Sequence, residues 1–267
     1  MHLKNNNIQP TNLLFSFLGG LVLLFLVAPL IGMVISTTPD SLFETVQNKD
    51  VTNSIKLTIL TSFGGTLFFA FLVIPLAYLM ARTDFPGKSI VAGIIDLPIV
   101  IPHSAAGIAV LGFISRDSFL GQAADSIGLN LVGHPIGISL AMAFVSIPFL
   151  FNAARDGFET VPERLEKVAL NLKASPIKVF FTISLPLASR SIGSGFVMMF
   201  ARGMSEFGAV VIVAYHPMIT PVLVYEWFTS FGLNYARPVA VIFIVVCLAF
   251  FVLLRILMSD KKNRKNA

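Results

Sequence analysis

Arg202 and Glu206 are oppositely charged residues inside a long apolar run at 188–215. Because they stand four positions apart, a helix would place both side chains on one face. An ionisable side chain at membrane depth indicates a functional role by default. Two interpretations remain open: a self-neutralising pair packed between helices, or an arginine that attracts an anion along a pathway. We favour the first, because a carboxylate beside the pathway would cancel most of the arginine's field.

The apolar run at 89–115 contains further polar and helix-breaking residues. Pro98 and Pro102 each free a backbone carbonyl, which a membrane helix tolerates where neighbouring helices or a water-filled cavity supply a partner. Asp96 and His103 stand seven positions apart, roughly on one helix face, although the prolines between them disturb that spacing. We expect this run to form a pore wall. The candidates for the pore or its gate are Pro102, His103, Ser104, Arg202, Glu206 and Gly208.

The longest polar interruption of the chain lies at 155–190. Thr160 and Glu163 have the spacing of a capping box at a helix start, and an apolar stripe follows at helical spacing. Ser175 and Pro176 are a second start signal, an N-cap followed by the first helical position. The segment therefore predicts two short helices that meet at a tight corner, one face docked on a protein and the other in water. The stripe residues are Val161, Leu165, Val168 and Leu172.

This segment resembles the EAA loop of ABC-importer permease subunits through LEKVA at 165–169, KASP at 173–176 and LP at 185–186. The resemblance implies a cytoplasmic coupling helix that sits in a cleft of a separate ATPase subunit. Lys167 replaces the acid that the family prefers, and Lys173 replaces its glycine. A lysine in the left-handed conformation costs roughly 1 kcal/mol. The residues that the resemblance assigns to ATPase coupling are Glu163, Arg164, Glu166, Lys167, Ala169, Lys173, Ser175 and Pro176.

Composition places the chain in a membrane. Of its 267 residues 55% are hydrophobic and 12% are charged, and a helix needs about 20 apolar residues to cross the hydrocarbon core. Continuous apolar runs predict an all-α polytopic protein with six spans, which we place at about 13–36, 57–81, 89–115, 136–154, 188–215 and 237–258. Because the basic residues do not gather on one soluble face, we expect no nucleic-acid partner. Cys247 is the one cysteine, so neither a disulfide nor a thiolate metal cluster is expected.

Lysine and arginine set the expected orientation, because these residues concentrate in cytoplasmic loops. Fourteen of the 19 fall on the side of the 155–190 loop and both termini, which we therefore place in the cytoplasm. They are Lys4, Arg82, Lys88, Arg155, Arg164, Lys167, Lys173, Lys178, Arg190, Arg255, Lys261, Lys262, Arg264 and Lys265.

A second resemblance concerns the branch of the family. The run MSEFGAVVIVAY at 204–215 and PVLVYE at 221–226 are similar to tungstate and molybdate permeases of archaeal type, and residues 82–88 with the proline-broken span after them resemble the molybdate/sulfate branch. The resemblance implies a type I importer permease fold, with residues 1–267 as a single transmembrane domain in a prokaryotic cell membrane of archaeal type. It implies a homodimer with two ATP-binding subunits and an extracellular oxyanion-binding protein. A sulfate or thiosulfate importer is the alternative.

No G-x-x-x-x-G-K-[ST] motif occurs in the sequence, so the chain lacks the loop that cradles ATP phosphates. We expect a translocating subunit without catalytic residues, metal or cofactor of its own, with ATP and magnesium bound by the partner ATPase. A membrane enzyme or stand-alone channel is the rival of another class. It predicts activity without an ATPase and no ordered role for the 155–190 loop.

Overall fold

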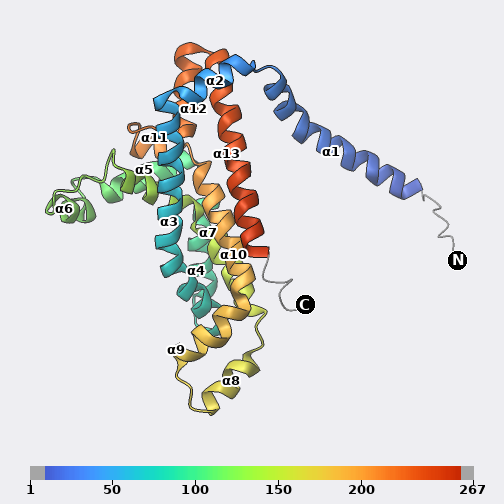
Figure 1. Cartoon of the computed structure of the whole chain (residues 1–267). Coiled ribbons are helices and arrows are strands. Elements are labelled where there is room, and N and C mark those ends of the chain that lie inside the picture. The colour runs from blue at the N-terminus through green and yellow to red at the C-terminus, as the bar shows by residue number, and fades with distance from the viewer. Residues whose placement is uncertain (1–9, 260–267) are drawn as a thin grey trace.

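The structure, a computed structural model, describes residues 10–259, and every regular element within that part is a helix (Figure 1). Lys4 and the basic residues at 261–265 lie outside the described residues. In chain order the elements are α1 (Pro10–Ile35), α2 (Pro39–Gln47), α3 (Lys49–Arg82), α4 (Lys88–Val100), α5 (His103–Ile114), α6 (Phe119–Asp125), α7 (Pro135–Glu159), α8 (Glu163–Asn171), α9 (Pro176–Val179), the π-helical turn η1 (Phe180–Ser184), α10 (Leu185–Met204), α11 (Val210–Val213), α12 (Thr220–Phe231) and α13 (Leu233–Ser259).

Five helices in the described part are long and apolar enough to cross a membrane. They are α1, α3, α7, α13 and the continuous helix Pro176–Met204, which α9, η1 and α10 form together. The pair α4 and α5 makes a sixth span if it is counted as one, although its two halves meet at 113°. The all-helical architecture predicted from the apolar runs is confirmed.

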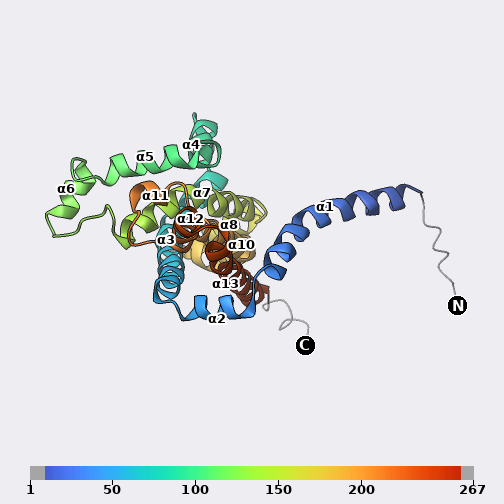
Figure 2. The same cartoon turned by 90° about the horizontal axis from the view of Figure 1, so that it is seen from above.

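The centre of the molecule is a bundle of α3, α7 and α10, whose residues contact one another along most of their lengths (Figures 1 and 2). Close approach depends on small residues at the crossings. A Cβ atom at Gly195 of α10 would lie 2.7 Å from the Cβ of Ala153 on α7, closer than side chains pack. Phe151 and Phe158 of α7 are fully buried in the cluster that the three helices share, and Phe200 of α10 is buried against α3 and α13. The bundle is therefore the rigid part against which the loops are held.

Two segments project from this bundle on opposite sides. Helix α1 points away from it, and α5 and α6 extend on the other side, as the view from above shows (Figure 2). The apolar side chains of α1 are exposed along its length. Leucine and phenylalanine side chains can face lipid without cost, because lipid tails are as apolar as these side chains and give little drive for a helix to pack on the bundle. The exposed surface of α1 is therefore compatible with a membrane span.

Two expectations about the spans were wrong, and the effect of the prolines in the third span is confirmed. The bend between α4 and α5 places Asp96 and His103 on different helices, and Asp96 accepts a hydrogen bond from the Asn152 amide at 2.7 Å. The helix expected at 188–215 ends at Met204, and a break at 205–209 precedes α11. The second short helix of the polar loop is not separate, because it continues through η1 into α10 as the start of the fifth span.

Candidate functional site

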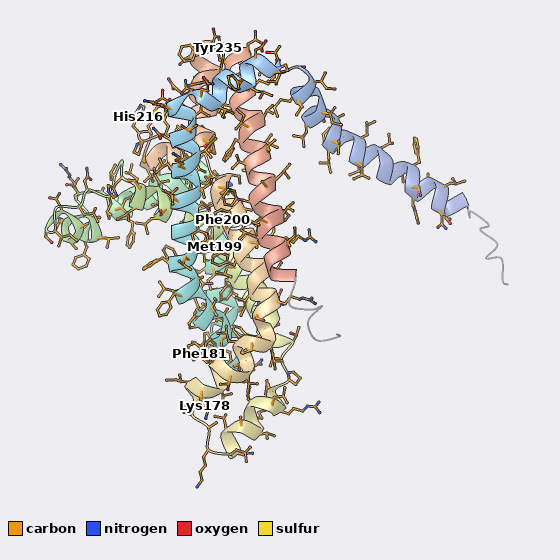
Figure 3. The ribbon with its side chains drawn as sticks, viewed as in Figure 1. Lys178, Phe181, Met199, Phe200, His216 and Tyr235 are labelled. Carbon is orange, nitrogen blue, oxygen red and sulfur yellow. The ribbon has the colours of Figure 1, made fainter. Side chains whose placement is uncertain are left out.

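Helix α8 lies beyond one end of the bundle, joined to α7 and α9 by short turns (Figure 1). In Figure 3 the side chains of Lys178 and Phe181 mark this end, and those of His216 and Tyr235 mark the opposite one. The helix begins at Glu163 after Pro162, with no side chain capping its N-terminus. The predicted capping box is therefore wrong. Thr160 instead ends α7, and its hydroxyl donates to the Gly157 carbonyl at 2.7 Å.

The apolar stripe of α8 faces solvent. Leu165, Val168 and Leu172 are 41%, 58% and 77% exposed, whereas Val161 is buried in the turn before the helix. A row of exposed apolar side chains on a short polar helix marks an interaction surface. Arg164 is exposed, and so are Glu163 and Lys167, whose side chains pair at 2.7 Å on the same helix.

Glu166 does not lie on the wet face of α8, contrary to expectation. Its side chain points into the protein, the residue is 6% exposed, and Arg82 at the end of α3 meets it. The Arg82 Nη2 donates to Glu166 Oε1 at 2.8 Å, and the Nε lies 3.1 Å and 3.0 Å from the two carboxylate oxygens. The hydroxyls of Ser184 and Tyr78 donate to the same carboxylate at 2.7 Å and 3.2 Å.

Burial raises the pKa of the Glu166 carboxyl, but the hydrogen bonds from Arg82, Ser184 and Tyr78 and the charge of Arg82 outweigh burial, so its pKa lies below the ordinary value of 4.5. The group is therefore ionised at neutral pH, and the pair holds α8 as a charge-assisted contact. The sequence does not connect Arg82, Tyr78 or Ser184 to Glu166. Arg82 enters the prediction as a topological charge and in the resemblance of residues 82–88, and its expected position on the same side as the 155–190 loop is the one available signal.

The corner after α8 has the geometry that the glycine position of the family implies. Lys173 has φ 64°, the one positive φ of a non-glycine residue in the described part. Its N–H donates to the Leu170 carbonyl at 2.9 Å, and the Ala174 N–H donates to the Ala169 carbonyl at 3.1 Å. These two bonds are a Schellman motif. Ser175 then caps the next helix, accepting from the Lys178 N–H at 3.3 Å, with Pro176 at the first turn, as predicted.

Deeper in the molecule, Arg202 and Glu206 form an ion pair of 2.8 Å, although they do not share a helix. Because α10 ends at Met204, Glu206 reaches back from the break that follows. Its carboxylate is 1% exposed, accepts from the Ala209 N–H at 2.8 Å and lies 2.8 Å from His103 Nδ1. The Arg202 Nη2 lies 2.8 Å from the same ring nitrogen. His103 is thus a third partner that the sequence did not connect to this pair.

The start of α5 is held against this cluster by small residues. A Cβ at Gly208 would lie 2.7 Å from His103 Cβ, and one at Gly107 would lie 2.8 Å from the Ala209 carbonyl oxygen. Pro102 and Ser104 flank His103 and are exposed. The six pore candidates therefore lie at one place, where the broken third span meets the broken fifth. Within residues 10–259, no group of three or more His, Cys, Asp or Glu side chains could hold a metal ion.

The family described as the inner membrane component of binding-protein-dependent transport systems matches residues 73–265, which include both the α8 segment and the charge cluster. The chain belongs to this family of ABC-importer permeases. The molybdate/tungstate transport system permease protein of Pyrococcus abyssi is 42% identical over 94% of this chain and 96% of its own length. The sulfate transport system permease protein of Salmonella typhimurium is 30% identical over 76% and 73%.

Solved structures support the fold of the permease. A bacterial alginate ABC transporter in complex with an alginate pentasaccharide-bound periplasmic protein contains a chain with a TM-score of 0.73 at 19% identity, covering 93% of this chain and 94% of that one. The α-helical importer fold expected for the chain is confirmed at this level. The likeness concerns the backbone and carries no information on substrate.

The first prediction concerns Lys173. Lys173→Gly should raise the free energy of unfolding by up to about 1 kcal/mol, because glycine removes the left-handed strain without removing a Schellman bond. Thermal unfolding of the purified permease in detergent measures it. A clear loss of stability would mean that the lysine side chain makes a stabilising contact that outweighs the strain.

The second prediction is a pH dependence. Glu166→Gln should lower the free energy of unfolding by about 1–3 kcal/mol at neutral pH, because it removes a buried charge-assisted contact. The folded pKa is lowered, so the stabilisation is fully present above 4.5 and is lost as the pH falls through the folded pKa. The difference in melting temperature between wild type and Glu166→Gln should therefore shrink on acidification. Asp84→Asn, which breaks an exposed pair with Lys88, is the matched control. A difference that is constant with pH would contradict the assignment.

The third prediction concerns the cluster. Glu206→Ala should destabilise the permease by roughly 1–3 kcal/mol, since it leaves the Ala209 N–H and the partly exposed Arg202 guanidinium without their carboxylate acceptor. Arg202→Met with Glu206→Gln removes both charges, keeps an acceptor for the Ala209 N–H, and should restore stability to near the wild-type value. If the pair is structural, the double variant also retains uptake in proteoliposomes. A stable double variant without uptake would place Arg202 in the translocation pathway instead.

Proposed function

We propose that the chain is the membrane-spanning permease subunit of an ATP-driven importer of molybdate or tungstate. The observation that carries the proposal is the 42% identity, along nearly the whole chain, to the molybdate/tungstate transport system permease protein of Pyrococcus abyssi. In this proposal two copies of the chain form the pathway in a prokaryotic, archaeal-type cell membrane with both termini in the cytoplasm. Two ATP-binding subunits bind ATP and magnesium, and an extracellular protein delivers the oxyanion.

The coupling role falls to residues 155–187. Support comes from the exposed row that Leu165 and Val168 of α8 form with Leu172 just after it, which suits a cleft in the ATPase. The charge distribution agrees, because this loop lies on the side where most lysines and arginines fall. Glu163, Arg164 and Lys167 surround the apolar row and would meet the partner, whereas Glu166 serves the permease's own interior.

Transport of a dianion does not require a tight site in the permease. Weak, distributed contacts let an ion pass, whereas strong binding at a gate would trap it. The charge cluster fits this requirement, because Glu206 offsets the positive charge of Arg202. Selectivity between molybdate, tungstate and sulfate then rests mainly with the extracellular binding protein. The second candidate is sulfate import, which the 30% identity to the Salmonella typhimurium sulfate permease protein favours less strongly.

The test is reconstitution of the permease with its ATPase and binding protein in proteoliposomes. We expect uptake of radiolabelled tungstate and molybdate that requires both ATP and the binding protein. Sulfate in about hundredfold excess should compete weakly, which corresponds to binding of sulfate weaker than that of molybdate or tungstate by about 3 kcal/mol. An ATPase whose P-loop lysine is replaced is the matched control and should abolish uptake.

Two outcomes would contradict the proposal. Effective competition by sulfate or thiosulfate would assign the permease to the sulfate branch. Oxyanion flux through the permease alone, without ATPase or ATP, would indicate a channel.

A further inference from the structure

The cytoplasmic helix α8 is attached to the bundle through one charged side chain. Along Glu163–Asn171, all of which the structure describes, Glu166 is the one buried residue. The leucine and valine side chains of the helix face outward instead. A helix that buries no apolar side chain has little hydrophobic attachment of its own. What fixes α8 to the rest of the permease is therefore the contact that Glu166 makes.

That contact joins segments that are distant in sequence. Arg82 ends α3, Ser184 ends η1 immediately before α10, and both donate to Glu166. The Arg82 Nη2 also donates to the Val161 carbonyl at 2.9 Å, in the turn that leads into α8. Arg82 thus holds the helix and the chain that enters it. The planar guanidinium makes several bonds in a fixed geometry, which a lysine cannot do.

A cluster of aromatic side chains packs against the ion pair of Arg82 and Glu166. The Tyr78 ring packs edge-to-face on Phe158 of α7 at 5.2 Å and on Phe180 of η1 at 4.9 Å, and the Arg82 guanidinium lies 5.9 Å from the centre of the Tyr78 ring. Helices α3, α7 and α10 all reach this group. A displacement of α8 is therefore delivered to the bundle at the point where its three central helices converge.

We propose that Arg82 is a positioning residue for transport: through its ion pair with Glu166 it transmits the movement of α8 to α3 and α10, so that ATP hydrolysis is tied to opening of the pathway. Buried ion pairs are weak sources of net stability, and apolar replacements often serve as well. Their distinctive property is a fixed relative position of the two partners. A link of this kind passes a displacement on, whereas a pliable apolar contact would absorb part of it.

The proposal rests on the proposed function and is tested in the same proteoliposomes, with the complete complex. The readout is the ratio of oxyanion taken up to ATP hydrolysed, measured beside the amount of ATPase that copurifies. Glu166→Gln should assemble normally and lower this ratio by at least about fivefold, a usual size for coupling between distant sites. Arg82→Lys keeps the positive charge but loses the several hydrogen bonds of the planar guanidinium, and it should give an intermediate ratio of uptake to hydrolysis. It also provides the test if Glu166→Gln does not fold.

Asp84→Asn is the matched control, because it turns a carboxylate into an amide two residues after Arg82, in an exposed pair of 2.9 Å with Lys88. It should leave the ratio unchanged. Wild-type uptake per ATP in the assembled variants would overturn the proposal. So would loss of ATPase binding, since the pair would then shape the docking surface instead of transmitting movement. Absence of uptake in the wild-type complex would count against the proposed function, and the two failures are thereby distinguished.

Discussion

Unsatisfied backbone groups are costly in an apolar medium, and the arrangement of this permease follows from that constraint. Two of its spans are broken, at 101–102 and at 205–209, and the two breaks lie against each other. Gly107 and Gly208 let the two broken segments approach each other closely. Glu206 accepts a hydrogen bond from the Ala209 N–H, which a carbonyl would have accepted if the helix had continued. No buried side-chain nitrogen or oxygen in residues 10–259 lacks a hydrogen-bond partner. The break at 205–209 therefore satisfies one of its own backbone N–H groups, and it contacts the break at 101–102 through His103 at the start of α5.

The same logic governs the two buried carboxylates. Glu206 is neutralised by Arg202 beside it in sequence, and Glu166 by Arg82, which lies 84 residues away. In both pairs the arginine side chain is more exposed than the carboxylate, and Arg82 also donates to the Val161 carbonyl. The carboxylate, which water reaches least, accepts the hydrogen bonds of several donors. Removing one partner is costly because the other charge stays behind. These two pairs are accordingly the points at which the loops are held to the bundle.

Sequence reasoning recovered what local periodicity and backbone conformation determine. The left-handed Lys173 and the Ser175 cap each depend on neighbours within a few positions, and the structure has them as expected. The apolar stripe was recovered in part, because Leu165, Val168 and Leu172 are exposed together whereas Val161 is buried before α8 begins. The orientation of Glu166 could not be read in this way, because its partners are 84 and 18 residues distant and the stripe leaves every acid on the outer side. The end of α10 at Met204 was missed for a related reason. No proline marks it, and a side chain that captures a nearby backbone N–H stops the helix instead.

Helix α10 connects the two buried charges. Ser184, at its start, donates to Glu166, and Arg202, in its last turn, pairs with Glu206. Eighteen residues at 1.5 Å each separate these contacts by about 27 Å, close to the thickness of a hydrocarbon core. The helix packs against α3 and α7, and Ser62 of α3 donates to the Phe200 carbonyl at 2.8 Å. The helix is thus held at its start by the contact with Glu166 of α8, and its other end lies at the break that faces α5. Movement applied at Glu166 has a direct structural route to the place where the pathway candidates gather.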